Sequence, residues 1–341
     1  MAERPPIRVD FASDNVAPAA PEAMEALVRA NAGSFASYGA DAVVARAADL
    51  IRELLDADAE VRFVSSGTAA NALALTMLAE PFEAVLAHRH AHVLTDEAGA
   101  PGRFGAGLGL IPLDGASGRI DPATLDAALA GPELSHRQAA AALSLTNATE
   151  YGTLYEATAL ARLVGMAKAH GLGVHLDGAR LANAAAGGCE PRSLARLGLD
   201  VLVVGGSKAG MPPTEALVVF DRALARRLDA RLKQAGQLVS KARFLAAPWI
   251  GMLETGAWMR RAAHANAMAR RLAERAPFPL AHPVESNAVF LTMDAAALGR
   301  LSAQGLLVHR FLDGSVRFMC SWATAPDQVD ALAEALSLAA G

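Results

Sequence analysis

The sequence contains the stretch Val201-Leu202-Val203-Val204-Gly205-Gly206-Ser207-Lys208-Ala209-Gly210, in which four aliphatic residues lead into two glycines, a serine and a lysine. The aliphatic run predicts a buried strand with Lys208 at its tip. Lysine is among the residues least often buried without a partner, and a pocket that lowers its pKa turns it into a Schiff-base nucleophile. Taken alone, such a lysine is more often a surface residue on a loop.

A second predicted strand tip carries a carboxylate, in the stretch Val174-His175-Leu176-Asp177-Gly178-Ala179-Arg180. An enzyme that uses pyridoxal phosphate (PLP) needs a lysine to hold the aldehyde of the cofactor and an acidic residue to pair with its ring nitrogen. Lys208 and Asp177, each at a strand tip, therefore indicate a PLP site. The alternative for Asp177 is a helix N-cap that follows a strand.

The length and composition suggest a two-domain α/β enzyme. The 341 residues exceed the size at which one hydrophobic core stops growing, so two domains are expected. The net charge of −4, without a basic run, argues against nucleic acid as a partner. Cys189 and Cys320 stand in no metal-ligand or Cys-x-x-Cys spacing, which favours a reducing cytoplasm. The first residues lack the apolar core of a signal peptide, and no apolar run approaches the ~20 residues of a membrane span. We expect a cytoplasmic protein without a membrane segment.

Strands alternate with helices over the first two thirds of the chain, which predicts a mainly parallel sheet covered on both faces. In such sheets ligands bind at the carboxyl ends of the strands, where Asp177 and Lys208 fall. A third strand ends at the turn Ser65-Ser66-Gly67-Thr68, and the helix after it presents backbone N–H groups to a phosphate. Such turns also occur without a ligand. The strands are predicted at residues 60–64, 84–87, 109–113, 140–146, 174–177, 201–205 and 216–220.

The chain divides into an N-terminal arm (1–20), a large domain (21–240) and a smaller C-terminal α/β domain (241–341). A charged segment at 222–243, with leucines at i, i+4 and i+8, predicts a long helix that links the two domains. In the small domain we expect strands at 289–293 and 316–320, a long helix that ends near residue 275, and a closing helix at 327–338.

Short blocks along nearly the whole chain carry a family resemblance. They are Ala12-Ser13-Asp14-Asn15, Tyr38-Gly39, Gly67-Thr68-Ala69-Ala70-Asn71, Ala91-His92-Val93, Thr95-Asp96-Glu97-Ala98-Gly99-Ala100-Pro101, His175-Leu176-Asp177-Gly178-Ala179-Arg180, Gly205-Gly206-Ser207-Lys208, Lys233-Gln234-Ala235-Gly236-Gln237-Leu238-Val239-Ser240-Lys241 and Arg317-Phe318-Met319-Cys320-Ser321-Trp322. With these blocks the chain resembles the low-specificity L-threonine aldolases, in the branch with a Gly-Gly-Ser/Thr-Lys motif. The resemblance implies the PLP-dependent transferase-like fold, which is the aspartate-aminotransferase fold or fold type I.

The resemblance also implies roles for single residues. Lys208 would form the Schiff base with PLP, and Asp177 would keep the ring nitrogen protonated. His92 would stack on the ring and is a candidate base. Arg180 would lie beside the cofactor and, with Ser13 and Arg317, grip the substrate carboxylate, since the planar fork of arginine gives two charge-assisted bonds. The alternative for Arg317 is a solvated strand residue. The phosphate of the cofactor would be bound by Ser66, Gly67, Thr68 and Ser207.

The histidines at 88, 90 and 92 alternate, so an extended strand could present them together like metal ligands. No carboxylate or cysteine joins them in short range, and we expect no metal.

The chain departs from the family at Thr149, where better-known members carry a histidine that reaches the substrate hydroxyl. Thr149 is grouped with the substrate-binding residues, but threonine is a poor general base at pH 7. The base that deprotonates the substrate hydroxyl is therefore open among His92, a bound water and Glu150.

The implied activity is that of an aldehyde-lyase acting on L-threonine, L-allo-threonine or related L-β-hydroxy-α-amino acids such as phenylserine. Retro-aldol cleavage would yield glycine and an aldehyde. The closer alternative is another PLP reaction of the same fold on amino acids, either β-elimination or transamination. A second alternative is a non-catalytic binding module.

The resemblance further implies a homodimer with shared active sites, and two such dimers would form a tetramer. Tyr38, counted among the substrate-binding residues, and Lys233 would then reach the site of the neighbouring subunit. Lys233 would supply the cation that the serine and threonine donors lack for the phosphate. Lys241 is the second candidate, and the alternative for Lys233 is a solvated helix face.

Overall fold

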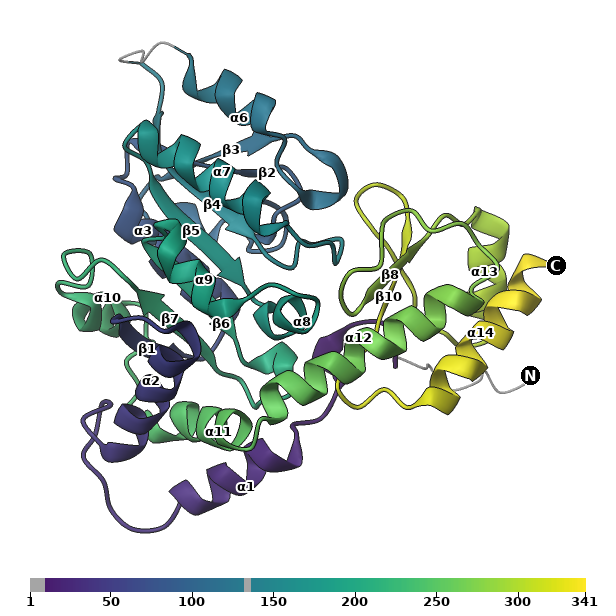
Figure 1. The fold of residues 1–341 in the computed structure, drawn as a ribbon, viewed down its shortest axis with the longest axis horizontal. Coiled ribbons are helices and arrows are strands. Elements are labelled where there is room, and N and C mark those ends of the chain that lie inside the picture. The colour runs from purple at the N-terminus through teal and green to yellow at the C-terminus, as the bar shows by residue number, and fades with distance from the viewer. Residues whose placement is uncertain (1–9, 132–135) are drawn as a thin grey trace.

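A seven-stranded sheet forms the centre of the larger body in the computed structural model, which describes residues 10–131 and 136–341 (Figure 1). The strand order is β1-β7-β6-β5-β4-β2-β3, in which β7 runs antiparallel to both neighbours and the other pairs are parallel. The mainly parallel α/β sheet that the sequence predicts is confirmed. The strands are β1 (Glu60–Val64), β2 (Glu83–His88), β3 (Gly109–Leu113), β4 (Ala139–Thr146), β5 (Gly173–Gly178), β6 (Val201–Gly205) and β7 (Glu215–Val219).

Helices surround this sheet and continue into the second part of the chain. The α-helices are α1 (Pro21–Ala30), α2 (Ala42–Leu55), α3 (Gly67–Leu78), α4 (His92–Thr95), α5 (Ala100–Phe104), α6 (Pro122–Leu129), α7 (Ala157–Ala169), α8 (Leu181–Ala186), α9 (Pro191–Leu194), α10 (Leu228–Gln234), α11 (Arg243–Glu254), α12 (Ala257–Arg275), α13 (Ala295–Ala303) and α14 (Pro326–Ala340). Short 3-10 turns are η1 (Asp14–Val16), η2 (Ala116–Gly118), η3 (Ala195–Leu197) and η4 (Ser207–Ala209).

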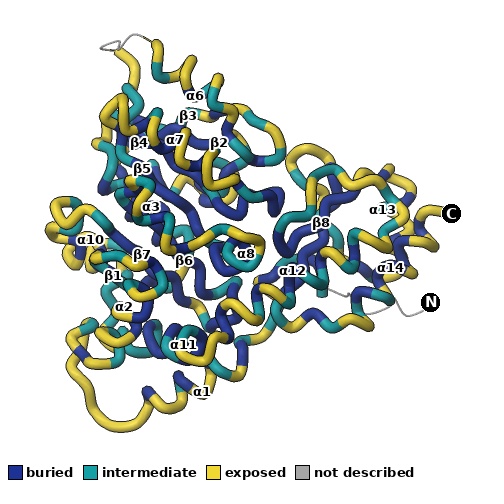
Figure 2. The backbone as a smooth tube through the Cα atoms, viewed as in Figure 1, coloured by how far each residue is buried: buried dark blue, intermediate teal, exposed yellow. Residues whose placement is uncertain are grey.

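Both faces of the large sheet are buried under helices, as the uninterrupted aliphatic run of β6 predicts. Val201 and Val203 pack on the face that α3 and α10 cover, whereas Leu202 and Val204 pack on the face of α2, α7 and α11. In Figure 2 the central strands appear as the dark blue, buried interior of this body. The sheet is therefore a rigid base whose carboxyl ends can position side chains.

A second, smaller sheet lies at the other end of α12 (Figure 1). It has the antiparallel order β8-β10-β9, formed by β8 (Ala288–Leu291), β9 (His309–Arg310) and β10 (Val316–Met319). The predicted strands at 289–293 and 316–320 and the predicted closing helix are found here, as β8, β10 and α14. The sequence analysis did not predict β9 or α13.

The N-terminal arm packs on the small sheet. Phe11 is buried in the core that β8, β10 and α14 share, and its carbonyl oxygen accepts a hydrogen bond from the backbone N–H of Met319 at 2.9 Å. Residues 1–9 of the predicted arm lie outside the described residues. The part that is described connects the small sheet to α1.

The long helix predicted at 222–243 is wrong. Only α10 forms there, because Arg227 adopts a left-handed backbone with φ of 66° before it and Gly236 does so with φ of 71° after it. Leu228 and Leu232 are buried in the core, so the leucine spacing is used over two turns and not more.

The helix α11 bears on the predicted domain boundary. Although it begins after residue 240, it packs on α1 and α2 of the large domain. The domain boundary at 240/241 stays a prediction.

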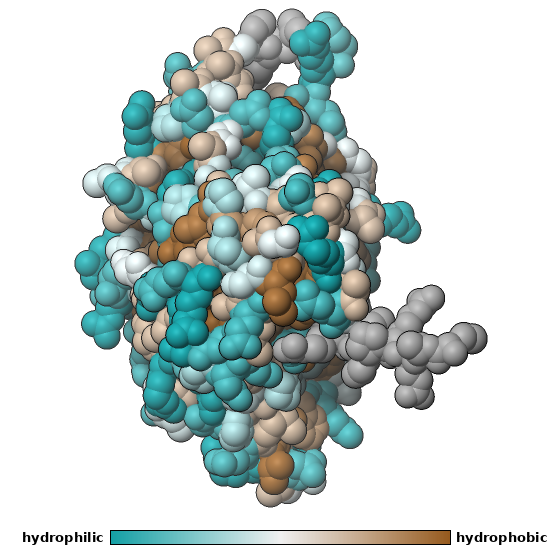
Figure 3. Space-filling model, turned by 90° about the vertical axis from the view of Figure 1, so that its right-hand side faces the viewer, coloured by the Kyte–Doolittle hydropathy of each residue, from teal (hydrophilic) through white to brown (hydrophobic). Residues whose placement is uncertain are grey.

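No helix within residues 10–131 and 136–341 combines the length and the apolar character needed to cross a membrane. On the face of the molecule that Figure 3 shows, small hydrophobic patches are interspersed among hydrophilic residues. The hydrophobic residues of this chain are thus used mainly in the cores of the two sheets.

Trp249 of α11 links the helix layer to the tip of β6. Its side chain is fully buried, and its indole N–H donates a hydrogen bond to the hydroxyl of Thr214 at 3.0 Å. Trp249→Ala should lower the free energy of unfolding by about 3–5 kcal/mol, because it removes a large aromatic group and leaves a cavity. Urea unfolding followed by circular dichroism measures the change. In the control Phe82→Ala, which truncates an aromatic residue that is 71% exposed, the change should stay within about 0.5 kcal/mol. An unaltered urea midpoint for Trp249→Ala would contradict the prediction.

Candidate active site

Lys208 lies just beyond the carboxyl end of β6, in η4. The two glycines before it are required by close backbone contacts. A Cβ atom on Gly205 would lie 2.0 Å from the carbonyl oxygen of Ala179, and one on Gly206 would lie 2.4 Å from that of Thr214. The tip of β6 is pressed between the chain segments that follow β5 and precede β7, which fixes the backbone that carries Lys208.

A buried carboxylate, Glu215 at the start of β7, holds the same tip. Its Oε2 accepts a hydrogen bond from the backbone N–H of Gly206 at 2.7 Å, and burial raises the pKa of this carboxyl to about 7. The hydroxyl of Ser207 bonds to Glu215 and accepts from the N–H of Thr214 at 3.2 Å. Ser207 is therefore held within the protein on two sides. No pattern in the sequence indicates this role of Glu215, because one polar residue at the start of a strand is ordinary.

Asp177 lies near the end of β5, opposite Val203 in the register of the two parallel strands. Its buried carboxylate accepts hydrogen bonds from Nδ2 of Asn71 at 2.8 Å and from the N–H of Ala179 at 2.9 Å. Burial works to raise the pKa of Asp177, but the nearby His175 and Lys208 and the two hydrogen bonds hold it below its ordinary value. The group is thus an anion at neutral pH. It is not the N-cap of α8, a position that Arg180 occupies.

A cavity of about 330 Å³ lies beside Lys208. It is lined by segments far apart in the sequence: the arm, the ends of the large sheet and the segment around β9. Phe311, which the sequence analysis missed, is one wall, and its ring packs edge-on against Tyr151 with 5.0 Å between centroids. The lining residues are Ser13, Asn15, His92, Asp96, Glu150, Arg180, Lys208, His309, Arg310, Phe311, Leu312 and Arg317.

Arg180 is fixed in this cavity by a buried ion pair with Asp14. Its Nε donates to Oδ2 of Asp14 at 2.7 Å and its Nη2 donates to Oδ1 at 3.0 Å. Although burial alone would raise the pKa of Asp14, Arg180 holds it below its ordinary range. Nδ2 of Asn287, next to β8, donates to the same carboxylate at 3.1 Å. The pairing occupies one edge of the guanidinium group and orients the rest.

Arg317 of β10 lines the same cavity. Its Nη2 donates to the carbonyl oxygen of Ala12 at 3.3 Å, while its buried Nε has no hydrogen-bond partner among the described residues. Burial and the positive charge of Arg180 both lower the pKa of Arg317. Two arginines that share a cavity form a site that suits a carboxylate.

His92 lines the cavity at the start of α4. Its Nδ1 lies 2.9 Å from Oε1 of Glu97, whose side chain is fully buried. The other histidines of the alternating set point to different partners. Nε2 of His88 bonds to the carbonyl oxygen of Gly115 at 3.0 Å, and Nδ1 of His90 bonds to the hydroxyl of Tyr151 at 2.5 Å. The three rings thus have separate hydrogen bonds.

Thr149 does not line the cavity. Its side chain is buried, and its hydroxyl bonds to the carbonyl oxygen of Ser117 at 3.1 Å and to the hydroxyl of Thr153 at 2.8 Å. The next residue, Glu150, does line the cavity, and its Oε1 accepts the backbone N–H of His92 at 3.1 Å. Burial and the negative charge of Asp177 raise the pKa of Glu150.

The predicted phosphate turn lies at the N-terminus of α3. Ser66 is the N-cap and accepts a hydrogen bond from the N–H of Ala69 at 3.3 Å. A Cβ atom added to Gly67 would meet no heavy atom of residues 10–131 or 136–341 within 4 Å, so the space beside the turn is open. Thr68 is the next residue of α3. Ser66, Gly67 and Thr68 do not line the cavity beside Lys208.

Tyr38 and Lys233 contact one another away from that cavity. Nζ of Lys233 lies 4.7 Å from the centre of the Tyr38 ring, and both residues are exposed. The backbone N–H of Tyr38 donates to the carbonyl oxygen of Ser240 at 3.0 Å, which joins the loop before α2 to the loop after α10. Within one subunit these residues are not brought together with Lys208.

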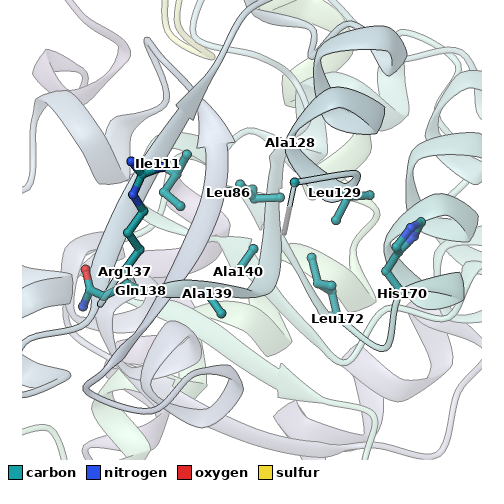
Figure 4. Close-up of a pocket in the computed structure, with 11 residues that line it drawn as sticks. Leu86, Ile111, Ala128, Leu129, Arg137, Gln138, Ala139, Ala140, His170 and Leu172 are labelled. Carbon is teal, nitrogen blue, oxygen red and sulfur yellow. The ribbon is translucent and has the colours of Figure 1, made fainter. Parts of the chain in front are cut away.

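Another cavity, of about 370 Å³, opens near the start of β4 (Figure 4). Its walls are mainly aliphatic, among them Leu86, Ile111 and Leu172, and Arg137 and His170 also line it. Ala139 and Ala140 place it at the amino end of β4, away from the strand ends that carry Asp177 and Lys208. It shares no residue with the site beside Lys208.

The residues at the strand ends fit PLP in charge and in space. Lys208 can bond to the aldehyde, and the anionic Asp177 can hold a protonated ring nitrogen. The open space at Gly67, next to the N-terminus of the 12-residue α3, suits a phosphate. The fold and this set of strand ends define a PLP-dependent enzyme of fold type I.

Comparisons with known proteins agree. The family model of beta-eliminating lyases matches residues 10–296. The low specificity L-threonine aldolase of Pseudomonas aeruginosa is 45% identical over 97% of this chain and 98% of its own length. That of a Pseudomonas species is 44% identical over 95% of each chain. A solved structure of the Leishmania major threonine aldolase matches 97% of this chain and 99% of its own, with a TM-score of 0.91 and 30% identity.

The chain therefore belongs to the beta-eliminating lyase family and, within it, to the low specificity L-threonine aldolases. The family, the lyase class, fold type I and the cofactor PLP that the sequence predicts are confirmed.

Asp14→Ala would leave the guanidinium of Arg180 buried without its partner. We expect the free energy of unfolding to fall by about 3–5 kcal/mol, because an uncompensated buried charge is costly. The control Asp58→Ala breaks a surface ion pair, in which the side chain of Asp58 is 75% exposed and that of Arg222 is 66% exposed. It should leave the urea midpoint nearly unchanged. Equal effects of the two substitutions would show that the Asp14–Arg180 pair contributes no more than a surface ion pair.

Proposed function

We propose that this chain cleaves L-threonine and related L-β-hydroxy-α-amino acids to glycine and an aldehyde. The observation that carries the proposal is the shared cavity, which Lys208, Arg180 and Arg317 line together. Two arginines and a lysine that line a cavity of about 330 Å³ suit a small amino acid whose carboxylate binds to the arginines. The Pseudomonas relatives bear the name of this activity.

The proposed cofactor site uses residues from several strand ends. Lys208 would bond to the aldehyde of PLP, Asp177 would pair with its ring nitrogen, and His92 would contact the ring. When bound, PLP supplies an electron sink for the electrons of the Cα–Cβ bond as it breaks. Its phosphate would be bound by Ser66, Gly67, Thr68 and Ser207.

The substrate carboxylate would be held by Arg180, Arg317 and Ser13. Because Asp14 fixes one edge of Arg180 and the arm carbonyl of Ala12 holds Arg317, the two guanidinium groups are oriented before substrate arrives. A carboxylate fixed at two points leaves the substituents of Cα in one orientation. This orientation aligns the Cα–Cβ bond for cleavage and supplies much of the acceleration.

The hydroxyl proton of the substrate would pass to His92 or Glu150, which both line the cavity. Thr149 is a weaker candidate for contacting the substrate, since its hydroxyl already bonds to Ser117 and Thr153. Its predicted role in substrate binding is not supported by these contacts.

A product assay tests the proposal and separates it from its alternative. Purified protein with PLP, incubated with L-threonine, L-allo-threonine or phenylserine, should release glycine with acetaldehyde or benzaldehyde. Asp177→Asn keeps the shape but removes the charge, so kcat should fall by about 100-fold or more while PLP absorbance remains. Lys208→Ala should lose both the absorbance band and turnover. Near-normal turnover of Asp177→Asn would assign Asp177 a structural role.

The products also separate the proposal from its alternative. If the enzyme released a 2-oxo acid with ammonia in place of glycine and an aldehyde, the reaction would be a β-elimination.

We also propose a two-fold dimer with shared sites, and a tetramer built from two dimers. The phosphate donors proposed above carry no positive charge, whereas Lys233 and Tyr38 are exposed and lie outside the cavity of their own subunit. A doubly charged phosphate in a partly dry site needs a cation, and Lys233 of a second subunit would supply it.

Lys233→Ala should weaken PLP affinity by about 10-fold or more, because a charge-assisted hydrogen bond is lost. Titration of the PLP-free protein with PLP measures this affinity. Lys168→Ala, which removes the partner of Asp200, is the control and should bind PLP normally. A fully active, PLP-saturated monomer in sedimentation would contradict the shared site.

The cytoplasm is the proposed location. Cys189 and Cys320 are both free thiols, which is the state that a reducing compartment maintains.

A further inference from the structure

The amide of Asn71 lies between two buried carboxylates. Its Nδ2 donates to Oδ2 of Asp177 at 2.8 Å and to Oε1 of Glu97 at 2.8 Å. The same Oε1 of Glu97 lies 2.9 Å from Nδ1 of His92. A continuous row of hydrogen bonds thus runs from Asp177 through Asn71 and Glu97 to His92.

The charges of this row balance in pairs. Two carboxylates in a dry interior repel one another. An amide that donates one N–H hydrogen bond to each of them reduces the free-energy cost of burying both. The nearby His175 and Lys208 lower the pKa of Asp177, whereas Glu97 is hydrogen-bonded to the imidazole of His92, which is its natural counter-charge. Glu97 has no other cation among its hydrogen-bond partners in the described residues.

The geometry also favours one tautomer of the ring. A carboxylate only accepts hydrogen bonds when ionised, so Nδ1 of His92 must carry the proton that it donates to Glu97. The other ring nitrogen, Nε2, is then left with its lone pair whenever His92 is neutral. Because His92 lines the cavity with Lys208, that nitrogen is the one available for proton transfer.

Two atoms in the row argue against a purely structural role. Oε2 of Glu97 and Oδ1 of Asn71 are buried and have no hydrogen-bond partner in the part of the chain that the structure describes. Unsatisfied buried polar atoms destabilise a fold by ~1–3 kcal/mol each, so packing alone would favour an apolar pair at these positions. Two such atoms in one hydrogen-bonded row therefore call for an explanation other than packing.

We propose that Glu97 is a positioning residue for His92: it fixes the proton on Nδ1, makes Nε2 the reactive nitrogen, and through Asn71 ties His92 to Asp177. This inference rests on the proposed function, in which His92 contacts PLP and is a candidate base. It assigns to Glu97 and Asn71 a function that sequence analysis did not.

The pKa of His92 reports this arrangement. The hydrogen bond with Glu97 raises it, burial lowers it, and the other charged groups that face the ring are Glu150 and Asp177, which raise it, and Lys208, which lowers it. Removal of the Glu97 charge should therefore lower the pKa of His92. The near-isosteric Glu97→Gln keeps the size of the side chain and a carbonyl acceptor but loses the charge.

The test follows the imidazole in the PLP-loaded enzyme by NMR with isotope-labelled histidine, assigned with His92→Asn. We expect a pKa above the ordinary histidine value in the unaltered enzyme and a decrease of about one unit or more in Glu97→Gln. The acid limb of the pH profile of kcat/KM should move down by the same amount, with PLP absorbance retained. Glu254→Gln, which neutralises an exposed carboxylate paired with Arg46, should move neither.

Two results would overturn the inference: a His92 pKa that is the same in Glu97→Gln and the unaltered enzyme, or one at or below the ordinary value in the unaltered enzyme. The second measurement needs no substitution at Glu97, so it decides even if Glu97→Gln does not fold. A protein that binds PLP but makes no glycine from threonine would refute the proposed function alone, because the titration of His92 is read independently of turnover.

Discussion

The close approach of Gly205 to the carbonyl oxygen of Ala179 is the constraint on which the rest of the site depends. With no side chain at Gly205, the ends of β5 and β6 come together and place Asp177, in β5, beside the turn after β6 that carries Lys208. Trp249 and Glu215 hold the far side of the same turn. Groups that project from buried strands are held more firmly than groups on loops, which suits a reaction that depends on orientation.

The remaining walls of the cavity come from segments that only the tertiary fold unites. Asp14 pairs with Arg180, which is 166 positions away, and accepts from Asn287, which is 273 positions away. One buried carboxylate thus connects the arm, the large sheet and the edge of the small sheet. The two cations proposed to bind the substrate carboxylate come one from each sheet, so their separation depends on how the two sheets are packed.

Much of the fold could be predicted because its signals are local. An aliphatic run followed by glycines indicates a buried strand with a tight end, and it placed Lys208 and Asp177 at one edge of the sheet. The two-residue β9 has no such pattern, so the wall around Phe311 was missed. Asn71 and Glu97 lie within blocks that resemble the family, yet their contact joins α3 to the segment after α4, and no spacing indicates it. The predicted length of the helix at 222–243 was wrong for a related reason, since leucine spacing does not indicate the left-handed residue Arg227 that precedes α10.

The bond between Phe11 and Met319 has a consequence for how the protein is made. The arm has its partner only after nearly the whole chain has left the ribosome, because Ala12 and Arg317 are 305 positions apart. At 5–20 residues per second, synthesis of that length takes roughly 15–60 s. During this interval Phe11 has no core to enter, and Asp14 and Arg180 can pair before Arg317 exists. The cavity is therefore closed last, by the final quarter of the nascent chain folding back onto its first residues.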